Sequence, residues 1–394
     1  MQSLHPIQQT RNTLFGKLFI TFLKKSCHFR LFHQRKLHFF LFKLFRPSTF
    51  VTERVSSFVQ VEQILPFQPH PKCNTARVKV VKKMAGLNIG AQPFVKWPGS
   101  KSQHIHILTQ ALPADFADIP NVTYIEPFVG GGALLFHMLQ TYPNIKRAII
   151  NDSNLDLIRT YNTVRDRAKE LVAELKKIQK EFLPLCEEER RDYFNEIRDE
   201  FNARLSGGIR HAAIFIFLNK TSNASYRTNG NGNFNGAYNH LQYPIICDER
   251  TIYADSKLLQ NVTICCGDYE KTYNEASGNS FFFLDPPYRP TGKRHNNNEF
   301  NDKEQIRLKK FCDLLSFRHF QWMLTNSDGK CQNPDDTFME QLYSNYNIER
   351  IWSKNAIVAK PEKREKLSEL LVRNFQREIL SLRDVHYRQL SFAF

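Results

Sequence analysis

The sequence predicts an α/β domain in which a mostly parallel sheet is covered by helices and is interrupted by a mainly helical insertion. Two observations lead to this prediction. In the 394-residue chain, short apolar runs alternate with longer amphipathic stretches after Met84, as in a parallel sheet joined by crossover helices. One interval between apolar runs is much longer than a single crossover helix requires, which is typical of an inserted lobe.

Five apolar runs predict the strands. Each is short and is separated from the next by a longer amphipathic stretch, which is the pattern of a sheet with helices on its faces. The expected strands span residues 122–125, 147–150, 262–266, 280–284 and 320–325.

The long interval lies between the second and third expected strands. It begins with the charged segment 165–204, which predicts helices with i, i+4 ion pairs. It ends with the Asn/Gly-rich stretch 219–240, where a rigid scaffold would carry a recognition element. A flexible surface loop is the alternative interpretation of that stretch.

Residues 1–83 hold most of the net charge. The chain carries a formal charge of +16, and this segment has 15 lysines and arginines against two acidic residues, Glu53 and Glu62. The body is almost balanced, so its affinity for nucleic acid must come from a local patch. The segment is interrupted by charges too often for a membrane span, which needs about 20 mainly apolar residues.

Three interpretations of residues 1–83 stay open. They are an organelle transit peptide, a basic amphipathic arm that touches DNA or membrane, and upstream sequence translated ahead of a true start at Met84. We favour the last, because organised patterning begins immediately after Met84. The segment is therefore expected to lie outside the functional domains.

The eight cysteines show neither C-x-x-C pairs nor the density of a disulfide scaffold, which fits a reducing compartment. Cys265 and Cys266 are adjacent in an apolar run. We interpret them as buried strand thiols rather than metal ligands, and we expect no metal site.

Glycines and a carboxylate follow the first two expected strands. The first continues into Glu126-Pro-Phe128 and then Gly130-Gly-Gly132, whose backbone can approach a ligand closely. A plain tight turn is the alternative, since the G-x-G-x-x-G fingerprint is missing. Asp152 ends the second strand, where a carboxylate can accept hydrogen bonds from both ribose hydroxyls of a nucleoside cofactor. A helix N-cap is the alternative there.

The most specific motif is Asp285-Pro286-Pro287-Tyr288, which follows a wholly apolar strand. Two prolines stop the strand and stiffen the turn, so the Asp285 carboxylate and the Pro286 carbonyl become neighbouring acceptors. Such a pair suits an aromatic amino group, whose lone pair is delocalised into the ring. Tyr288 offers a face on which an extruded base can stack. A Pro-Pro turn that caps a buried strand is the alternative.

Three segments in one order resemble those of the alpha-class DNA adenine-N6 methyltransferases of the Dam/DpnII type. They are 94–101 (FVKWPGSK), 126–132 (EPFVGGG) and 285–288 (DPPY). The match spans about Phe94 to Phe375 and includes a family-like ending with a strand over 346–351, the pair Asn355-Ala, and a helix over 366–374.

The resemblance implies a Rossmann-like, S-adenosylmethionine-dependent methyltransferase sheet with an inserted target-recognition domain. The catalytic domain would comprise residues 84–160 and 255–394, and the recognition domain residues 161–254. Trp97 and Lys101 would hold the methionine end of the cofactor, Asp152 its ribose and Asp268 its adenine. The full set of implied cofactor-binding residues is Trp97, Lys101, Glu126, Phe128, Gly130, Gly132, Asp152, Asp268 and Asp285.

The expected recognition hairpin departs from the family pattern. The chain reads NKTSNASYR over 219–227, which is one residue shorter and lacks the aromatic that would wedge into a vacated base stack. Arg227 can still read guanine bidentately, and Asn223 can pair with an adenine edge. The DNA-binding residues that we expect are Asn219, Lys220, Asn223, Tyr226 and Arg227.

The sequence therefore predicts a monomeric enzyme that methylates N6 of a flipped adenine in double-stranded DNA, without a metal and without a membrane partner. The resemblance implies a short target, such as a four-base palindrome of the GATC or CATG type, in a restriction-modification or DNA-marking system, and a restriction endonuclease for the same site as a candidate partner. Expected locations are the cytoplasm or nucleoid and the DNA compartment of a virus-infected host. Alternatives are methylation of RNA adenine or of a protein glutamine amide, and an inactive DNA-binding protein.

Overall fold

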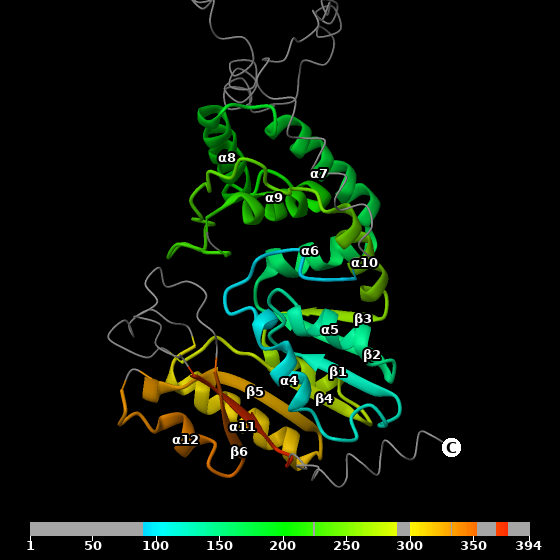
Figure 1. Cartoon of the computed structure of the whole chain (residues 1–394), viewed down its shortest axis with the longest axis vertical. Helices are drawn as coiled ribbons and strands as arrows, with labels where there is room; N and C mark the ends of the chain where they lie inside the picture. The colour runs from blue at the N-terminus through cyan, green and yellow to red at the C-terminus, as the bar shows by residue number, and fades with distance from the viewer. Residues whose placement is uncertain (1–89, 224, 290–299, 332, 353–367, 377–394) are drawn as a thin grey trace, which may run out of the picture. The chain divides into compact units, whose positions relative to one another are not determined.

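The computed structural model describes residues 90–223, 225–289, 300–331, 333–352 and 368–376. The basic segment 1–83 lies outside these residues, as does the pair Asn355-Ala. The centre of the described part is a seven-stranded sheet with helices on both faces (Figure 1). The predicted α/β class is confirmed.

All five predicted runs are strands, and the third and fourth have the predicted bounds. The strand predicted over 346–351 is also present, shifted by one residue. The strands are β1 (Val122–Glu126), β2 (Ile145–Asp152), β3 (Val262–Cys266), β4 (Ser280–Leu284), β5 (Gln321–Ser327), β6 (Asn347–Trp352) and β7 (Ser368–Arg373).

The strand order is β3-β2-β1-β4-β5-β7-β6. The pairs among β1 to β5 are parallel, whereas β7 is antiparallel to both β5 and β6. The expected helix over 366–374 is therefore wrong. Leu370 and Val372 are buried in one hydrophobic core and Leu371 in the other, because both faces of the sheet are covered at β7, and this apolar run fits that position.

Two hydrophobic cores cover the two faces of the sheet. Neighbouring residues of β1 show the alternation, since Tyr124 belongs to one core and Ile125 to the other. The first core contains residues from α4 (Ile105–Gln110), α5 (Ala133–Thr141), α6 (Leu155–Asp166) and α10 (Glu249–Leu259). The second contains residues from the 3-10 helix η2 (Tyr269–Glu275), α11 (Asp302–Phe317) and α12 (Phe338–Leu342).

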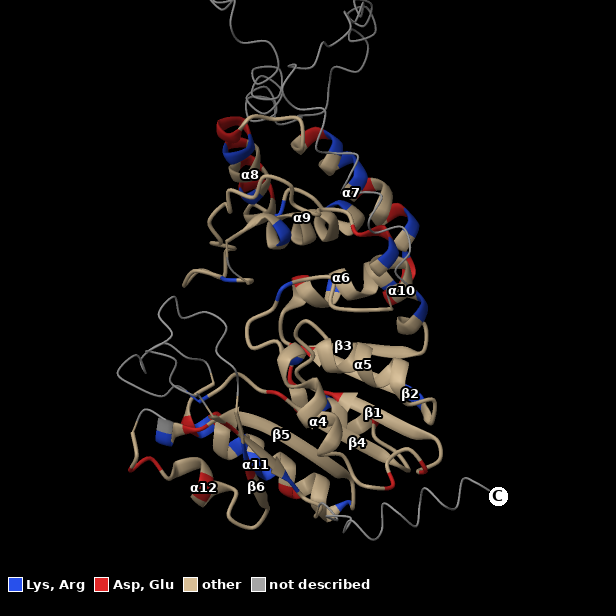
Figure 2. Cartoon of the chain, viewed as in Figure 1, with Lys and Arg blue, Asp and Glu red and all other residues tan. Residues whose placement is uncertain are grey.

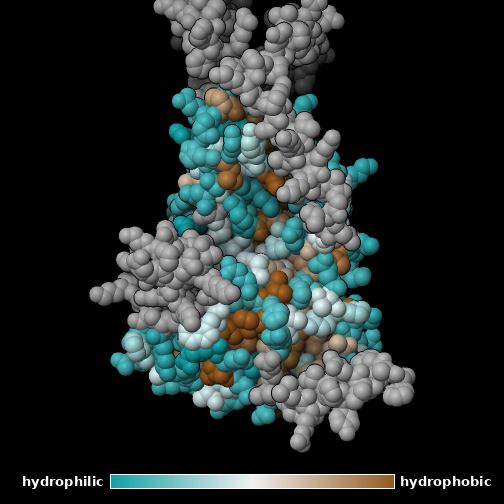
Figure 3. Space-filling model, in the orientation of Figure 1, coloured by the Kyte–Doolittle hydropathy of each residue, from teal (hydrophilic) through white to brown (hydrophobic). Residues whose placement is uncertain are grey.

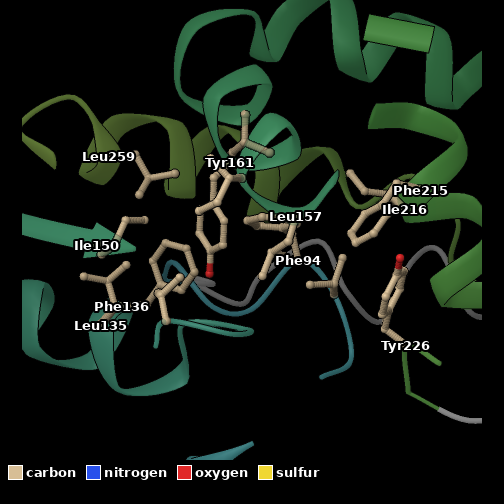
Figure 4. Packing of buried hydrophobic residues seen from close by; sticks show 14 of the residues in the cluster. Phe94, Leu135, Phe136, Ile150, Leu157, Tyr161, Phe215, Ile216, Tyr226 and Leu259 are labelled. Carbon is tan, nitrogen blue, oxygen red and sulfur yellow. The ribbon is translucent and has the colours of Figure 1, made fainter. Parts of the chain in front are cut away.

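The insertion between β2 and β3 is mainly helical, as predicted. Its inner helices are α7 (Ala168–Phe182), α8 (Glu187–Asn202) and α9 (Gly208–Thr221). Helix α9 is buried along most of its length and forms the centre of the lobe. Its core is continuous with that of the sheet, and Figure 4 shows Phe215 and Tyr226 of the lobe in the same cluster as Phe94 and Tyr161.

Lysines, arginines and acidic residues are interspersed along α7 and α8 (Figure 2). Arg210 of α9 joins two of these helices, because its guanidinium lies 2.8 Å from Glu174 and 3.0 Å from Glu200. We expected i, i+4 pairs within single helices. The charges also connect one helix to another, which ties the lobe together.

The Asn/Gly-rich stretch forms an ordered hairpin. Antiparallel bridges join Ser222 to Tyr238 and Thr228 to Phe234. The backbone N–H of Asn235 also donates to the Arg227 carbonyl at 3.0 Å. The interpretation of this stretch as a flexible loop is therefore wrong.

Strand β3 ends the sheet on one side. Its Cys265 and Cys266 are free thiols, and both are half-buried rather than buried as we expected, because an edge strand has one side open. Burial raises the pKa of both thiols. Among the described residues, no helix is long and apolar enough to cross a membrane.

Candidate active site

The candidate site lies where the parallel strands end. Glu126 ends β1, Asp152 ends β2, Asp285 follows β4, and Thr325 lies near the end of β5. Because β2, β1, β4 and β5 are neighbours in the sheet, these side chains share one edge. The strand order reverses direction between β1 and β4, and ligands of open α/β sheets bind at such a switch point.

The glycine turn after β1 depends on its glycines. Gly130 and Gly132 have φ values of 50° and 72°, in the left-handed region that other residues avoid. A Cβ atom on Gly130 would lie 2.7 Å from the Trp97 ring, and one on Gly132 would lie 2.5 Å from the Tyr161 hydroxyl. The turn is therefore held closely between Trp97 and Tyr161, which fixes its backbone at the edge of the sheet.

Asp152 braces this turn. Its carboxylate accepts hydrogen bonds from the backbone N–H groups of Gly130 at 3.1 Å and Asn154 at 2.9 Å. Burial raises the pKa of Asp152, and these backbone hydrogen bonds oppose the shift. The helix N-cap interpretation of Asp152 is wrong, because Asn154 caps α6 through the N–H of Leu157.

Glu126 is almost fully buried, with 2% of its surface exposed. Its Oε1 accepts a hydrogen bond from the Tyr124 hydroxyl at 2.7 Å. Burial raises the pKa of Glu126 to about 8; the Tyr124 hydrogen bond opposes this shift and the nearby Asp285 carboxylate adds to it. The side chain is thus largely protonated at neutral pH and would ionise beside a cationic ligand.

The Asp285 carboxylate is held by two donors. Lys101 Nζ lies 2.9 Å from Oδ1, and the Thr325 hydroxyl donates to the same oxygen at 2.7 Å. Burial raises the pKa of Asp285, while Lys101 and Thr325 oppose the shift. Among the described residues, both recorded contacts are on Oδ1, so Oδ2 is the oxygen that a substrate can use.

Lys101 lies against the Asp-Pro-Pro-Tyr motif. Its side chain is 4% exposed, and Nζ lies 4.7 Å from the centre of the Tyr288 ring. The Tyr288 hydroxyl donates to Glu369 of β7 at 2.6 Å. No sequence motif pointed to Glu369 or Thr325 as site residues. Their signals are weak, being a single acidic residue in an otherwise apolar run and a threonine near the end of a strand.

Residues 97–357 match the model of the family described as D12 class N6 adenine-specific DNA methyltransferase. The chain belongs to this family. It is an enzyme that methylates N6 of adenine in DNA, so the predicted family and activity are confirmed. RNA adenine and protein glutamine are set aside as substrates.

The matches to three relatives each span nearly the whole length of the relative. The methyltransferase is 40% identical to the type II methyltransferase M.MjaIII of Methanocaldococcus jannaschii, over 72% of this chain and 99% of that protein. It is 30% identical to the type II methyltransferase M1.LlaDCHI of Lactococcus lactis subsp. cremoris, over 73% and 96%. The DNA adenine methylase of Escherichia coli is 26% identical, over 71% and 93%.

Two of the residues expected to contact DNA are buried inside the methyltransferase. Asn219 is fully buried, and its amide accepts from Lys96 N at 2.7 Å and donates to Lys96 O at 2.8 Å. Tyr226 stacks on Trp97 with ring centres 5.1 Å apart and planes at 13°. In this structure both side chains join the lobe to the Trp97 segment and leave little surface for DNA.

The other hairpin residues are more open. Asn223 and Arg227 are exposed, and Lys220 is half-buried. Burial lowers the pKa of Lys220, and the carboxylates of Asp248 and Asp255 oppose this shift. Of the five residues predicted to bind DNA, Asn223 and Arg227 are therefore the two that the structure leaves exposed.

Asp268, which is expected to bond the cofactor's adenine, lies just after β3, and Phe128, another expected cofactor-binding residue, follows β1. Asp268 is exposed and pairs with Arg307 at 2.8 Å. Tyr269 directly follows Asp268 in the chain, and Phe128 packs on its ring with ring centres 5.0 Å apart. The structure thus brings Phe128 and Asp268 to the same part of the edge, beside the glycine turn.

Proposed function

We propose that the methyltransferase binds duplex DNA, extrudes one adenine from the stack and holds its N6 amino group at Asp285. The observation that supports this best is the half-buried Asp285 carboxylate, whose Oδ1 is held by Lys101 and Thr325 at a switch point of the sheet. N6 is inside a duplex and must leave the stack to reach such a site. Asp285 and the Pro286 carbonyl would accept the two N–H bonds and orient the nitrogen lone pair.

S-adenosylmethionine is the methyl donor that this family implies. It supplies a methyl group on a positively charged sulfur. The residues present suit it, because Glu126, Asp152 and Asp285 place more carboxylates than cations at the edge, and the tightly held Gly130 turn lies beside them. Trp97, Lys101 and Asp268 are proposed to complete the site, with Lys101 serving Asp285 as well as the cofactor.

The inserted lobe is proposed to recognise the DNA target. The catalytic domain would then be residues 84–160 with 255–394, and the recognition domain residues 161–254. The ordered hairpin exposes Arg227 and Asn223, which suit guanine and adenine edges respectively. We propose a short palindromic target, such as a GATC or CATG type, by analogy with the type II methyltransferases that the chain resembles.

The enzyme is proposed to act as a monomer, in the compartment that holds the DNA, with a restriction endonuclease for the same site as a candidate partner. On the face shown in Figure 3, apolar residues form separate patches among hydrophilic ones. Obligate dimers present larger continuous apolar areas. The names of the type II relatives support the restriction partner.

The test is to incubate the full chain with unmethylated plasmid and labelled S-adenosylmethionine, digest the DNA to nucleosides, and map the modified positions by sequencing. N6-methyladenine at one short motif is expected. Asp285→Asn should lower the rate about 100- to 1000-fold, as the loss of a central polar contact does at other active sites. Cofactor binding should stay within a few-fold.

The exposed Asp335, in the loop after β5, offers a matched control. Asp335→Asn makes the same chemical change away from the site and should leave the rate unchanged. A near-normal rate for Asp285→Asn would refute the assignment of Asp285. Methylation scattered over unrelated sequences would refute a specific target.

A further inference from the structure

Glu369 reaches the active site because β7 runs against the other strands. It is the second residue of β7, and its register partners are Ser327 at the end of β5 and Ile351 of β6. The start of an antiparallel strand lies beside the end of its neighbour. Glu369 therefore lies at the same edge as the residues that follow the parallel strands.

Three polar side chains of the site surround the Glu369 carboxylate. The Tyr288 hydroxyl donates to Oε2 at 2.6 Å. Lys101 Nζ and His104 Nδ1 lie 3.8 and 3.9 Å from the same oxygen. Lys101 and His104 are themselves buried, so the carboxylate closes a group of side chains that solvent scarcely reaches.

We propose that Glu369 is a positioning residue for adenine methylation, which fixes the Tyr288 ring through its hydroxyl and shares the Lys101 ammonium with Asp285. This inference rests on the proposed function of Asp285 and Tyr288. Glu369 acts through these residues, and no contact between Glu369 and the base is involved.

The first effect concerns the ring. Burial raises the pKa of Tyr288 well above its usual value, and the carboxylates of Asp285 and Glu369 raise it further. The hydroxyl therefore stays protonated and donates. A ring held at its far end keeps one orientation, and small misplacements of a stacking surface slow a reaction that depends on alignment.

The second effect concerns the balance of charge around Lys101. Its ammonium lies between the Asp285 carboxylate at 2.9 Å and the Glu369 carboxylate at 3.8 Å. Without Glu369, Asp285 would be the only carboxylate of this pair left to Lys101. A tighter Lys101–Asp285 pair at Oδ1 would draw negative charge from the carboxylate and make Oδ2 a weaker acceptor for the amino group of the substrate.

The experiment compares full-length variants in single-turnover methylation of a duplex carrying the target site. Glu369→Ala removes the acceptor and the charge, Glu369→Gln removes only the charge, and Tyr288→Phe removes only the donor. Glu349→Gln is the matched control, because Glu349 lies on neighbouring β6 and also pairs with an arginine, Arg373, at 2.9 Å. DNA binding, cofactor binding and thermal unfolding are measured for each variant.

Glu369→Ala is expected to lower the methylation rate about 10- to 100-fold, with DNA and cofactor affinities within about threefold of wild type. Glu369→Gln should lose less, since an oxygen remains for Tyr288. The combination with Tyr288→Phe should lose less than the product of the two single effects, because the two variants break one contact. With 2-aminopurine at the target position, Glu369→Ala should still extrude the base.

Three results would overturn the proposal: a wild-type rate in Glu369→Ala, equal losses in Glu369→Gln and Glu349→Gln, or fully multiplicative losses with Tyr288→Phe. If Glu369→Ala does not fold, the proposal is still tested by two comparisons. Glu369→Gln is compared with Glu349→Gln, and Glu369→Gln replaces Glu369→Ala in the combination with Tyr288→Phe. A wild-type enzyme that forms no N6-methyladenine would refute the proposed function instead. If the wild type methylates DNA and Glu369→Ala does so at the same rate, only the role of Glu369 is refuted.

Discussion

At the carboxyl edge of the sheet, burial raises the pKa of Glu126 to about 8 and also raises that of Asp285. At the base of the inserted lobe, Asp156 is buried as well, yet its pKa is lowered, because hydrogen bonds from His211 and Arg204 outweigh the effect of burial. Both regions bury carboxylates. They differ in whether the chain supplies enough donors.

This difference separates stability from function. The lobe satisfies its buried charges internally, as Arg204 does at 2.7 Å from Asp156 and Arg210 does with two glutamates. At the edge, no ion pair is recorded for Glu126 among the described residues, and burying its carboxyl group costs folding free energy. Residues with strongly shifted pKa values cluster at functional sites, and here they mark the place where a cationic cofactor and an amino group would bring the missing partners.

The largest expected effect comes from removing Asp156, the paired carboxylate at the base of the inserted lobe. Asp156→Ala should lower the free energy of unfolding by about 2 kcal/mol, because it leaves the buried His211 and the half-exposed Arg204 without the carboxylate they contact. Equilibrium denaturation measures this. The contribution of Asp156 should be present above pH 4 and fade as the pH falls below it, since its folded pKa is depressed.

Asp166→Ala is the control for that prediction. Asp166 also pairs with an arginine, Arg165, at 2.7 Å, but half of its side chain is exposed. An exposed pair contributes under about 1 kcal/mol. Equal losses in the two variants would contradict the distinction between buried and exposed pairs.

The next prediction concerns Glu126 at the carboxyl edge of the sheet. A cationic cofactor should favour ionised Glu126, so binding should release a proton and affinity should rise with pH below 8, by up to about tenfold per pH unit for one linked proton. Isothermal titration calorimetry between pH 6 and 7.5 measures the slope. Glu126→Gln keeps the shape of the side chain but cannot ionise. The dependence of the cofactor affinity on pH should therefore fall by one proton. An unchanged slope would mean that Glu126 does not sense the cofactor.

The smallest effect lies where the two regions meet. Tyr226 of the lobe stacks on Trp97, which covers the glycine turn. Tyr226→Ala should weaken cofactor binding about fivefold, the value of about one aromatic stack, while Tyr226→Phe keeps the affinity. Tyr243→Ala, on an exposed tyrosine of the same lobe, should change nothing. Full affinity in Tyr226→Ala would show that the lobe and the cofactor turn are independent.

The sequence by itself determined the five parallel strands and the motifs that follow them. These features are local, because an apolar run defines a strand and the residues after it must lie at its carboxyl end. Asp152 and Asp285 were found for this reason. Asn219 and Tyr226 were assigned to DNA from their place in the hairpin, and only the tertiary structure shows that they are buried against the Trp97 segment.

Only the tertiary structure decided which distant residues complete the site. The run that contains Glu369 predicted a helix, and its true partners are strands β5 and β6. Strand direction and neighbour order depend on contacts between segments far apart in the chain, which local pattern does not encode. The position of Glu369 beside Tyr288 and Lys101 follows from the antiparallel insertion of β7 into an otherwise parallel sheet.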